Sequence, residues 1–298
     1  MTQELITNDL SLIKRQMKKK QKALFLKKFF RNKLALTGAI IMVIITFLAV
    51  LAPMIITTSP NALEATNRLL PPSAEHFFGT DNYGRDVFTR VMYGARVSLI
   101  IGFSVATLTA ILGTIIGLYA AYFKGFDGIL MRISDGLMAF PAILLAIAIM
   151  ASLGANITNV IIALTVVFTP LVGRTIRSAA LVVKEQTYVE ALKAQGASSL
   201  RIVWLNIFPN IISPLIVQAT FIFADAIIVE AALSFLGAGI PAPAPSWGNI
   251  LYDGKTVIFN AWWMTIFPGI AIMLTVFGLN LFGDGLRDLL DPHNKSKK

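Results

Sequence analysis

The sequence predicts an all-α integral membrane protein with six transmembrane helices. The chain has 298 residues, of which 56% are hydrophobic and only 14% charged, whereas a soluble domain carries about 25% charged residues. Uncharged stretches longer than the roughly 18 residues that suggest a bilayer span recur along it. The chain contains no cysteine, so disulfide bonds and cysteine-ligated metal sites are excluded.

The gaps between charged residues locate the spans. The spans are expected at 34–57, 97–123, 136–173, 210–236 and 261–282. The gap 136–173 is too long for a single helix and fits two short ones, broken around 154–159.

The distribution of lysine and arginine predicts the orientation, because cytoplasmic loops carry an excess of them. The basic segment 1–33 precedes the first span, 34–57, and should stay in the cytoplasm. The segment 58–96 is then external, and a five-helix core, 97–283, leads to a cytoplasmic tail, 284–298. Both termini would be cytoplasmic, in the plasma or inner membrane. A basic block can also bind nucleic acid, but beside a span the topological role is favoured, so lipid is the expected neighbour.

A charged helix-turn-helix pattern, YVEALKAQGASSLRIVWLNIFPN, occupies 188–210 between two spans. A helix over about 184–195 would end at Gly196, since glycine adopts the left-handed conformation at little cost. Pro209 is expected to stop the second short helix and turn the chain. The apolar face of this helix is predicted to contain Leu200, Val203, Trp204 and Ile207. A polar helix pair between spans indicates a docking surface, over 184–209, for a cytoplasmic protein.

Two carboxylates interrupt the span at 210–236. Asp225 and Glu230 are costly in an apolar segment and are candidates for lining a polar pathway through the bundle or for a contact between subunits. Five residues apart, they point about 140° from one another on a helix, so one is expected to line the pathway and the other to meet a neighbouring helix. In the second span, Gly113 and Gly117 would let another helix approach closely.

The external segment before the second span mixes glycines with charges of both signs. Two interpretations are open. The segment forms a compact collar with internal ion pairs, or it contacts another protein, outside the membrane or within it. Balanced charges usually satisfy one another, which favours the collar. The candidate contact residues are Asp81, Arg85, Asp86 and Arg90.

No catalytic motif is predicted. The sequence GNILYDGKT at 248–256 resembles a phosphate-binding loop, but five residues separate its glycines where that loop requires four. His76 and His293 lie in different loops without metal-ligand spacing. The chain is therefore expected to be no enzyme, and to hold no metal and no cofactor.

Several motifs resemble one family of membrane permeases. In EALKAQG and the residues that follow, Glu190, Ala191, Gly196 and Pro209 match the loop that marks permease subunits of bacterial ATP-binding-cassette (ABC) importers. The sequence departs from that loop at three positions, Leu192, Asn206 and Phe208. The stretches FFRNKLALTG, FGTDNYGRDVFTRVMYGARVSL, SFLGAGIPAPAPSWGNIL and LNLFGDGLRDLLDP make the likeness specific. From 29 to 292, the chain resembles the second permease subunit of dipeptide, oligopeptide and nickel importers.

This resemblance implies the type I ABC importer permease fold and a set of partners. Members pair with a homologous permease, act with two cytoplasmic ATP-binding subunits, and receive solute from an extracytoplasmic binding protein. A coupling helix at about 197–205 would transmit ATPase closure to the spans. The implied roles are polar anchors at Glu190 and Arg201, a tight turn at Gly196, and an apolar plug at Leu200 and Trp204. The alternative is that Glu190 only pairs with Lys193 on its own helix.

The implied solute is a di- or oligopeptide, with nickel or a metal chelate as the alternative. Two other classes stay open. A secondary transporter would work without ATP and would use Asp225 and Glu230 for coupling. A membrane scaffold that transports nothing would need only the docking loop.

Overall fold

The computed structural model describes residues 17, 20, 23–24 and 26–290, and the regular elements in this part are helices. Five are long: α2 (Lys33–Ile55), α3 (Val87–Tyr122), α6 (Ile157–Lys184), α9 (Phe208–Phe235) and α11 (Trp263–Leu290). The short ones are η1 (Ala65–Asn67), α4 (Lys124–Met138), α5 (Ala142–Leu153), α7 (Thr187–Ala194), α8 (Ser199–Arg201), η2 (Ile202–Ile207) and α10 (Trp247–Lys255). The described residues exclude Lys14, Arg15, Lys18, Lys19 and Lys22 of the predicted basic segment, and 291–298 of the tail.

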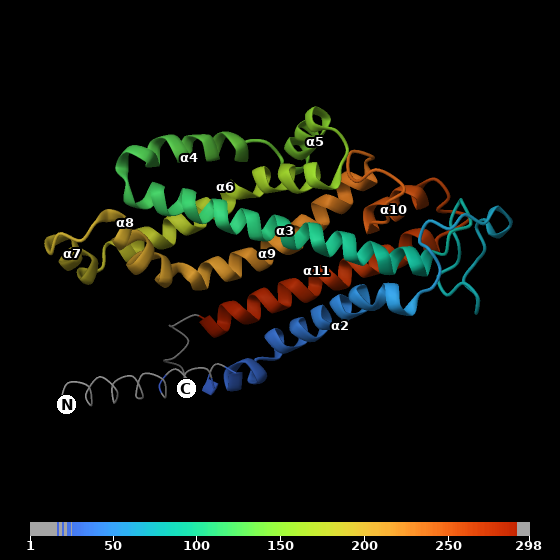
Figure 1. The fold of residues 1–298 in the computed structure, drawn as a ribbon, viewed down its shortest axis with the longest axis horizontal. Helices are drawn as coiled ribbons and strands as arrows, with labels where there is room; N and C mark the ends of the chain where they lie inside the picture. The colour runs from blue at the N-terminus through green and yellow to red at the C-terminus, as the bar shows by residue number, and fades with distance from the viewer. Residues whose placement is uncertain (1–16, 18–19, 21–22, 25, 291–298) are drawn as a thin grey trace, which may run out of the picture.

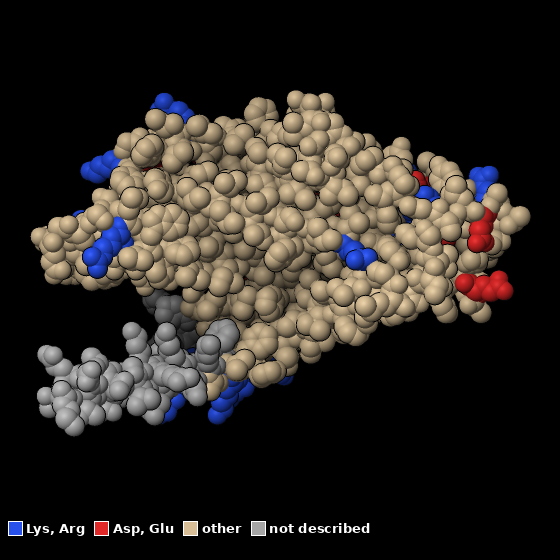
Figure 2. Space-filling model, in the orientation of Figure 1, with Lys and Arg blue, Asp and Glu red and all other residues tan. Residues whose placement is uncertain are grey.

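The long helices run side by side along the long axis of the molecule (Figure 1). At one end lie α7 and α8, together with the start of α2 and the end of α11. At the other end lie α10 and the irregular segment between α2 and α3. Charged side chains gather at these two ends, and the surface between them is nearly bare of charge (Figure 2). This distribution is what a bilayer around the middle of the bundle requires.

In the part of the chain that the structure describes, five helical runs are long and apolar enough to cross a membrane, and a bent pair of helices is the sixth candidate. The first, fifth and sixth predicted spans have counterparts in Lys33–Ile55, Ser199–Phe235 and Trp263–Leu290. The second helix begins at Val87, earlier than the predicted start at 97, and has 36 residues. At about 1.5 Å per residue it is some 54 Å long and exceeds the roughly 30 Å hydrocarbon core.

The stretch predicted as two short spans is built differently. Helix α5 has only 12 residues, about 18 Å, which is too short to cross the bilayer alone. It follows α4 after a bend of 93°, so these two helices form one broken span or a re-entrant segment. The predicted break around 154–159 is present, since α5 ends at Leu153 and Asn156 caps α6 with its side chain.

Helix α6 also continues past the predicted limit at 173, to Lys184. The arginines that ended the prediction are paired with carboxylates of α4. Both guanidinium nitrogens Nε and Nη2 of Arg177 donate to Asp127, at 2.6 and 2.7 Å, and Arg174 pairs with Asp135. These pairs hold α4 along α6 (Figure 1).

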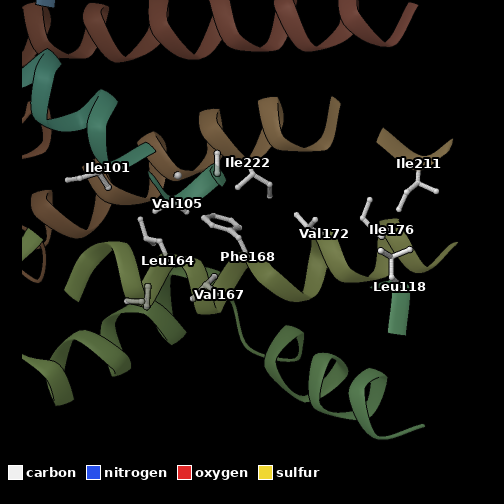
Figure 3. Packing of buried hydrophobic residues seen from close by; sticks show 14 of the residues in the cluster. Ile101, Val105, Leu118, Leu164, Val167, Phe168, Val172, Ile176, Ile211 and Ile222 are labelled. Atoms are coloured by element: carbon white, nitrogen blue, oxygen red, sulfur yellow. The ribbon is translucent and has the colours of Figure 1, made fainter. Parts of the chain in front are cut away.

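The main core lies where α3, α6 and α9 meet. Phe168 of α6 lies among Ile101 and Val105 of α3 and Ile222 of α9 (Figure 3). A side chain at Gly113 would come within 2.6 Å of Val172, and one at Gly117 would meet the backbone of α6. The close approach predicted for these two glycines is therefore confirmed, and its partner is α6.

Helix α2 packs on α11 through backbone-to-backbone contact. A Cβ atom at Gly38 would lie 2.6 Å from the carbonyl oxygen of Gly278 and 2.8 Å from Cα of Phe282. A Cβ atom at Gly285 would lie 2.5 Å from Cα of Ala35. The first helix is thus fixed to the last by glycines on both sides of the contact.

Candidate functional site

The predicted docking loop forms a projecting helix pair at one end of the bundle (Figure 1). Helix α6 ends at Lys184, and α7 follows as a separate helix after Glu185 and Gln186, where one helix over 184–195 was expected. Val189 of α7 is fully buried against the core. The hydroxyl of Tyr188 donates to the carbonyl of Asn206 at 3.3 Å. These contacts fix α7 to the helix that follows it.

Gly196 makes the turn between the two helices, as predicted. Its φ of +76° lies in the left-handed region. The Gly196 amide donates to the carbonyl of Lys193, and the Ala197 amide donates to that of Leu192, both at 3.0 Å. This pair of bonds is the Schellman motif, which closes a helix end with a defined exit direction. The turn is therefore a fixed element rather than a loose linker.

The prediction that Pro209 ends the second helix is wrong. The run Ser199–Phe235 is one continuous 37-residue helical element. A π-helical segment, Ile202–Ile207, precedes α9, and the Phe208 amide bonds the carbonyl of Val203, five residues back. The proline then occupies the first turn of α9, where a missing N–H costs little. The predicted coupling helix is consequently the end of a membrane-spanning helix.

Some of the predicted docking residues are exposed, and others are buried in the protein. Glu190, Ala191, Gly196 and Arg201 are exposed, and Leu200 is 56% exposed. Trp204 is half-buried, packs on the core, and lies with its ring centroid 5.6 Å from that of Phe208. Of the predicted apolar face, Val203 and Ile207 are buried in the protein. Of the predicted apolar plug, Leu200 is therefore free for a partner, as is the neighbouring Leu205, which is 67% exposed, while Trp204 anchors the helix. Within the described part of the chain, Glu190 forms no ion pair with Lys193.

The two carboxylates of α9 point in different directions, as their spacing predicted. Glu230 is fully buried and accepts hydrogen bonds from Ser98 of α3, at 3.2 Å, and from Ser234, at 2.9 Å. It is thus the carboxylate that meets a neighbouring helix. Asp225 is exposed and has no hydrogen-bond or ion-pair partner among residues 26–290.

The charged residues predicted to be external form a buried network. Asp81 accepts bonds from the amides of Tyr83 and Arg85 and from Nε of Arg85, at 2.8, 3.0 and 2.6 Å. The other end of the Arg85 guanidinium donates to Asp253 of α10 at 2.9 Å. Arg90 lies 3.6 Å from Asp81 and donates to the carbonyl of Pro60 at 3.2 Å.

Asp86 has a separate role at the start of α3. Its carboxylate caps the helix by accepting the amide of Thr89 at 2.7 Å, and it lies 3.0 Å from Nδ1 of His76. Asp81, Arg85 and Arg90 are each less than 10% exposed. The geometry therefore favours the collar interpretation, and a direct contact by these four residues with another protein stays a prediction.

Sequence reasoning missed Asp253, which lies inside the segment that resembled a phosphate-binding loop. This segment is the helix α10, capped by Ser246. Burial raises the pKa of the Asp253 carboxyl, and the nearby Arg85 and Arg90 act against that shift. Asp253 was visible in the sequence as an acidic residue among glycines. Its pairing with Arg85, 168 residues away, left no local signal. In the described segments, no group of histidines and carboxylates is arranged to hold a metal.

Comparison with known proteins agrees with this architecture. Residues 113–296 match the family described as binding-protein-dependent transport system inner membrane component, and residues 21–72 match the N-terminal TM domain of oligopeptide transport permease C. The chain is 52% identical over 269 residues to a putative peptide transport system permease protein of Brucella abortus, covering 90% of this chain and 91% of the relative. It is 48% identical over 271 residues to the dipeptide transport system permease protein DppC of Alkalihalophilus pseudofirmus, covering 91% and 89%.

A solved structure shows the same fold. An inward-facing structure of the MetNI methionine ABC transporter matches with a TM-score of 0.57 and 19% identity, over 68% of this chain and 97% of that one. The predicted type I permease fold is thereby confirmed. The family comprises transport subunits of the inner membrane that depend on a binding protein. The chain belongs to this family of binding-protein-dependent inner membrane permeases, and its homologues are peptide and dipeptide transport permeases.

Proposed function

We propose that this chain, together with a homologous permease, forms the pathway of an ATP-driven importer for di- and oligopeptides. Two cytoplasmic ATP-binding subunits would drive it, and an extracytoplasmic binding protein would deliver the solute. The names of the relatives support peptides, since they are peptide and dipeptide permeases. They do not favour the nickel alternative. The chain itself would supply no catalytic group and no cofactor.

One observation carries the proposal: the exposed helix pair continues rigidly into a membrane span. Leu200 is exposed at the start of the run Ser199–Phe235, and α7 is fixed beside it by the Gly196 turn and the Tyr188 hydroxyl. Force applied to this end by a closing ATPase is transmitted along α9 because a helix is stiff along its axis. A scaffold would need only the surface, and a secondary transporter would need no such surface.

A charge reversal tests the docking site. We expect Glu190→Arg to weaken the association with the ATP-binding subunits by roughly 2 kcal/mol, about 30-fold, because an exposed carboxylate on the docking face becomes a cation. The measurement is recovery of the ATPase with the permease in detergent. Glu75→Arg is the matched control, since Glu75 is also exposed but belongs to the segment between α2 and α3, at the opposite end of the bundle. Loss of ATPase in the Glu75 variant alone would place the docking site at the other end and overturn the proposal.

We further propose that the helix-pair end, and with it both termini, faces the cytoplasm. The absence of cysteine makes this testable, because a single introduced thiol is the only one in the chain. In intact cells, a membrane-impermeant maleimide is expected to label Glu75→Cys and to spare Glu190→Cys until the membrane is opened. Immediate labelling of Glu190→Cys, with protection of Glu75→Cys, would show the inverted orientation.

A further inference from the structure

A groove of mixed polarity runs along the open face of α9 at its helix-pair end. It forms a half-open cavity of about 550 Å³ between α6, α9 and α11, a size typical of pockets that take small molecules, about 300–1,000 Å³. Its polar lining residues are Thr175, Asn210, Ser213, Gln218 and Arg287, and apolar side chains complete the lining. These polar groups stand out in a bundle that is otherwise apolar.

Asp225 continues the same face of α9 toward the membrane centre. On a helix with 3.6 residues per turn, Asp225 points within about 20° of Gln218 and of Pro214, and about 40° from Phe221. All three of those residues line the cavity. The carboxylate therefore lies on the stripe that the groove follows, about one turn beyond its inner limit.

This face is unlike a surface built for lipid. The exposed side chains of α2 include Ile40, Val43, Ile44 and Phe47, as expected against hydrocarbon. On the open face of α9, the exposed Asp225 follows Asn210 and Gln218, beside apolar groups such as Phe221 and Ile228. A carboxylate directed into lipid costs several kcal/mol, and such residues usually face a water-filled cavity or a polar partner. The open face of α9 is thus a candidate wall of the solute path rather than a lipid contact.

We propose that Asp225 is a specificity residue of this path and binds the N-terminal ammonium group of the passing peptide. The inference rests on the proposed function. An α-amino group with a pKa near 8 is mostly protonated at neutral pH, so a free peptide carries a cation that a carboxylate in a poorly screened channel attracts. Arg287, at the helix-pair end of the same cavity, presents a guanidinium, which is the donor best matched to a peptide carboxylate. The groove therefore offers opposite charges in sequence to a zwitterionic solute.

The experiment uses the complete transporter in proteoliposomes, and its binding protein is added to the assay. Uptake of alanyl-alanine and of N-acetyl-alanyl-alanine is compared for the wild type, Asp225→Asn and Asp225→Glu. We expect Asp225→Asn to reduce uptake of the free dipeptide about ten-fold or more, since a hydrogen bond to a charged group is lost. The acetylated peptide, which has no ammonium, should be unaffected by this change. Asp225→Glu, which keeps the charge, should retain uptake of the free dipeptide.

The outcomes separate the alternatives. Equal uptake of the free dipeptide by Asp225→Asn and wild type would overturn the inference and leave the proposed function intact. Loss of the homologous permease on purification of Asp225→Asn would make the residue a subunit contact, which also overturns it. If the wild type takes up no acetylated peptide, the inference is tested by the uptake of the free dipeptide in the Asp225→Asn and Asp225→Glu variants. The inference then requires loss with Asn, retention with Glu and unchanged ATPase stimulation by the binding protein. Failure of the wild type to import any peptide with ATP would refute the proposed function itself.

Discussion

Replacement of Asp81 by alanine is expected to destabilise the protein by about 3–5 kcal/mol, the usual cost of removing one partner from a buried ion pair. Asp81 is 1% exposed and accepts three hydrogen bonds, two of them from backbone amides of the collar. Its loss leaves the guanidinium groups of Arg85 and Arg90 buried beside each other with only Asp253 between them. The measurement is the thermal unfolding midpoint of the purified protein in detergent.

The matched control is Asp253→Ala, which removes the second carboxylate of the same network. Its side chain is 24% exposed, so water can replace part of the lost interaction, and a smaller decrease of the midpoint is expected. An Asp81→Ala protein as stable as the wild type would show that the network contributes nothing to folding. A larger decrease of the unfolding midpoint for Asp253→Ala would show that the network stabilises α10 rather than the collar.

Replacement of Gly38 by leucine is expected to separate α2 from α11. A Cβ atom at this position meets backbone atoms of Gly278 and Phe282, which cannot rotate away as a side chain could. Overpacking lowers the free energy of unfolding by about 1–3 kcal/mol and sometimes more. Because the obstacle here is backbone, we expect a loss at the upper end of this range. The unfolding midpoint is expected to fall, and Gly38→Ala should show a smaller decrease.

Thr37→Leu is the control for this change. Thr37 precedes Gly38 on the same helix but is exposed, so the same large side chain points away from α11. This variant is expected to unfold like the wild type. If it is as destabilised as Gly38→Leu, the added bulk in α2, and not its contact with α11, would be responsible.

The fold was largely predictable because bilayer spans leave long uncharged stretches. The boundaries were wrong where charges are neutralised inside the protein. Arg90 belongs to α3 because Asp81 lies beside it, and Arg177 belongs to α6 because Asp127 binds it from α4. Asp81 lies outside α3 and Asp127 lies on another helix, so counting charges started the second span too late and ended the stretch at 173 too early. The bend between α4 and α5 is likewise set by tertiary packing.

The candidate site was predictable where the signal is local. The left-handed turn follows from Gly196, and the divergence of Asp225 and Glu230 follows from their spacing. The prediction failed at Pro209, because a proline in the first turn of a helix and a proline after a helix look alike in sequence. The Tyr188 hydroxyl and Asp253 were missed since their partners are fixed only by the three-dimensional arrangement.

The π-helical segment before α9 has a consequence for how the docking end can change over evolutionary time. Such a segment holds one residue more than an α-helix of the same span. Deleting a residue within Ile202–Ile207 would therefore restore regular α-helical winding and leave the direction of Leu200 relative to the membrane helix nearly unchanged. A deletion in the regular part of α9 would instead rotate everything before it by about 100°. The π-helical segment is thus the place where this element can lose one residue without re-aiming the docking surface.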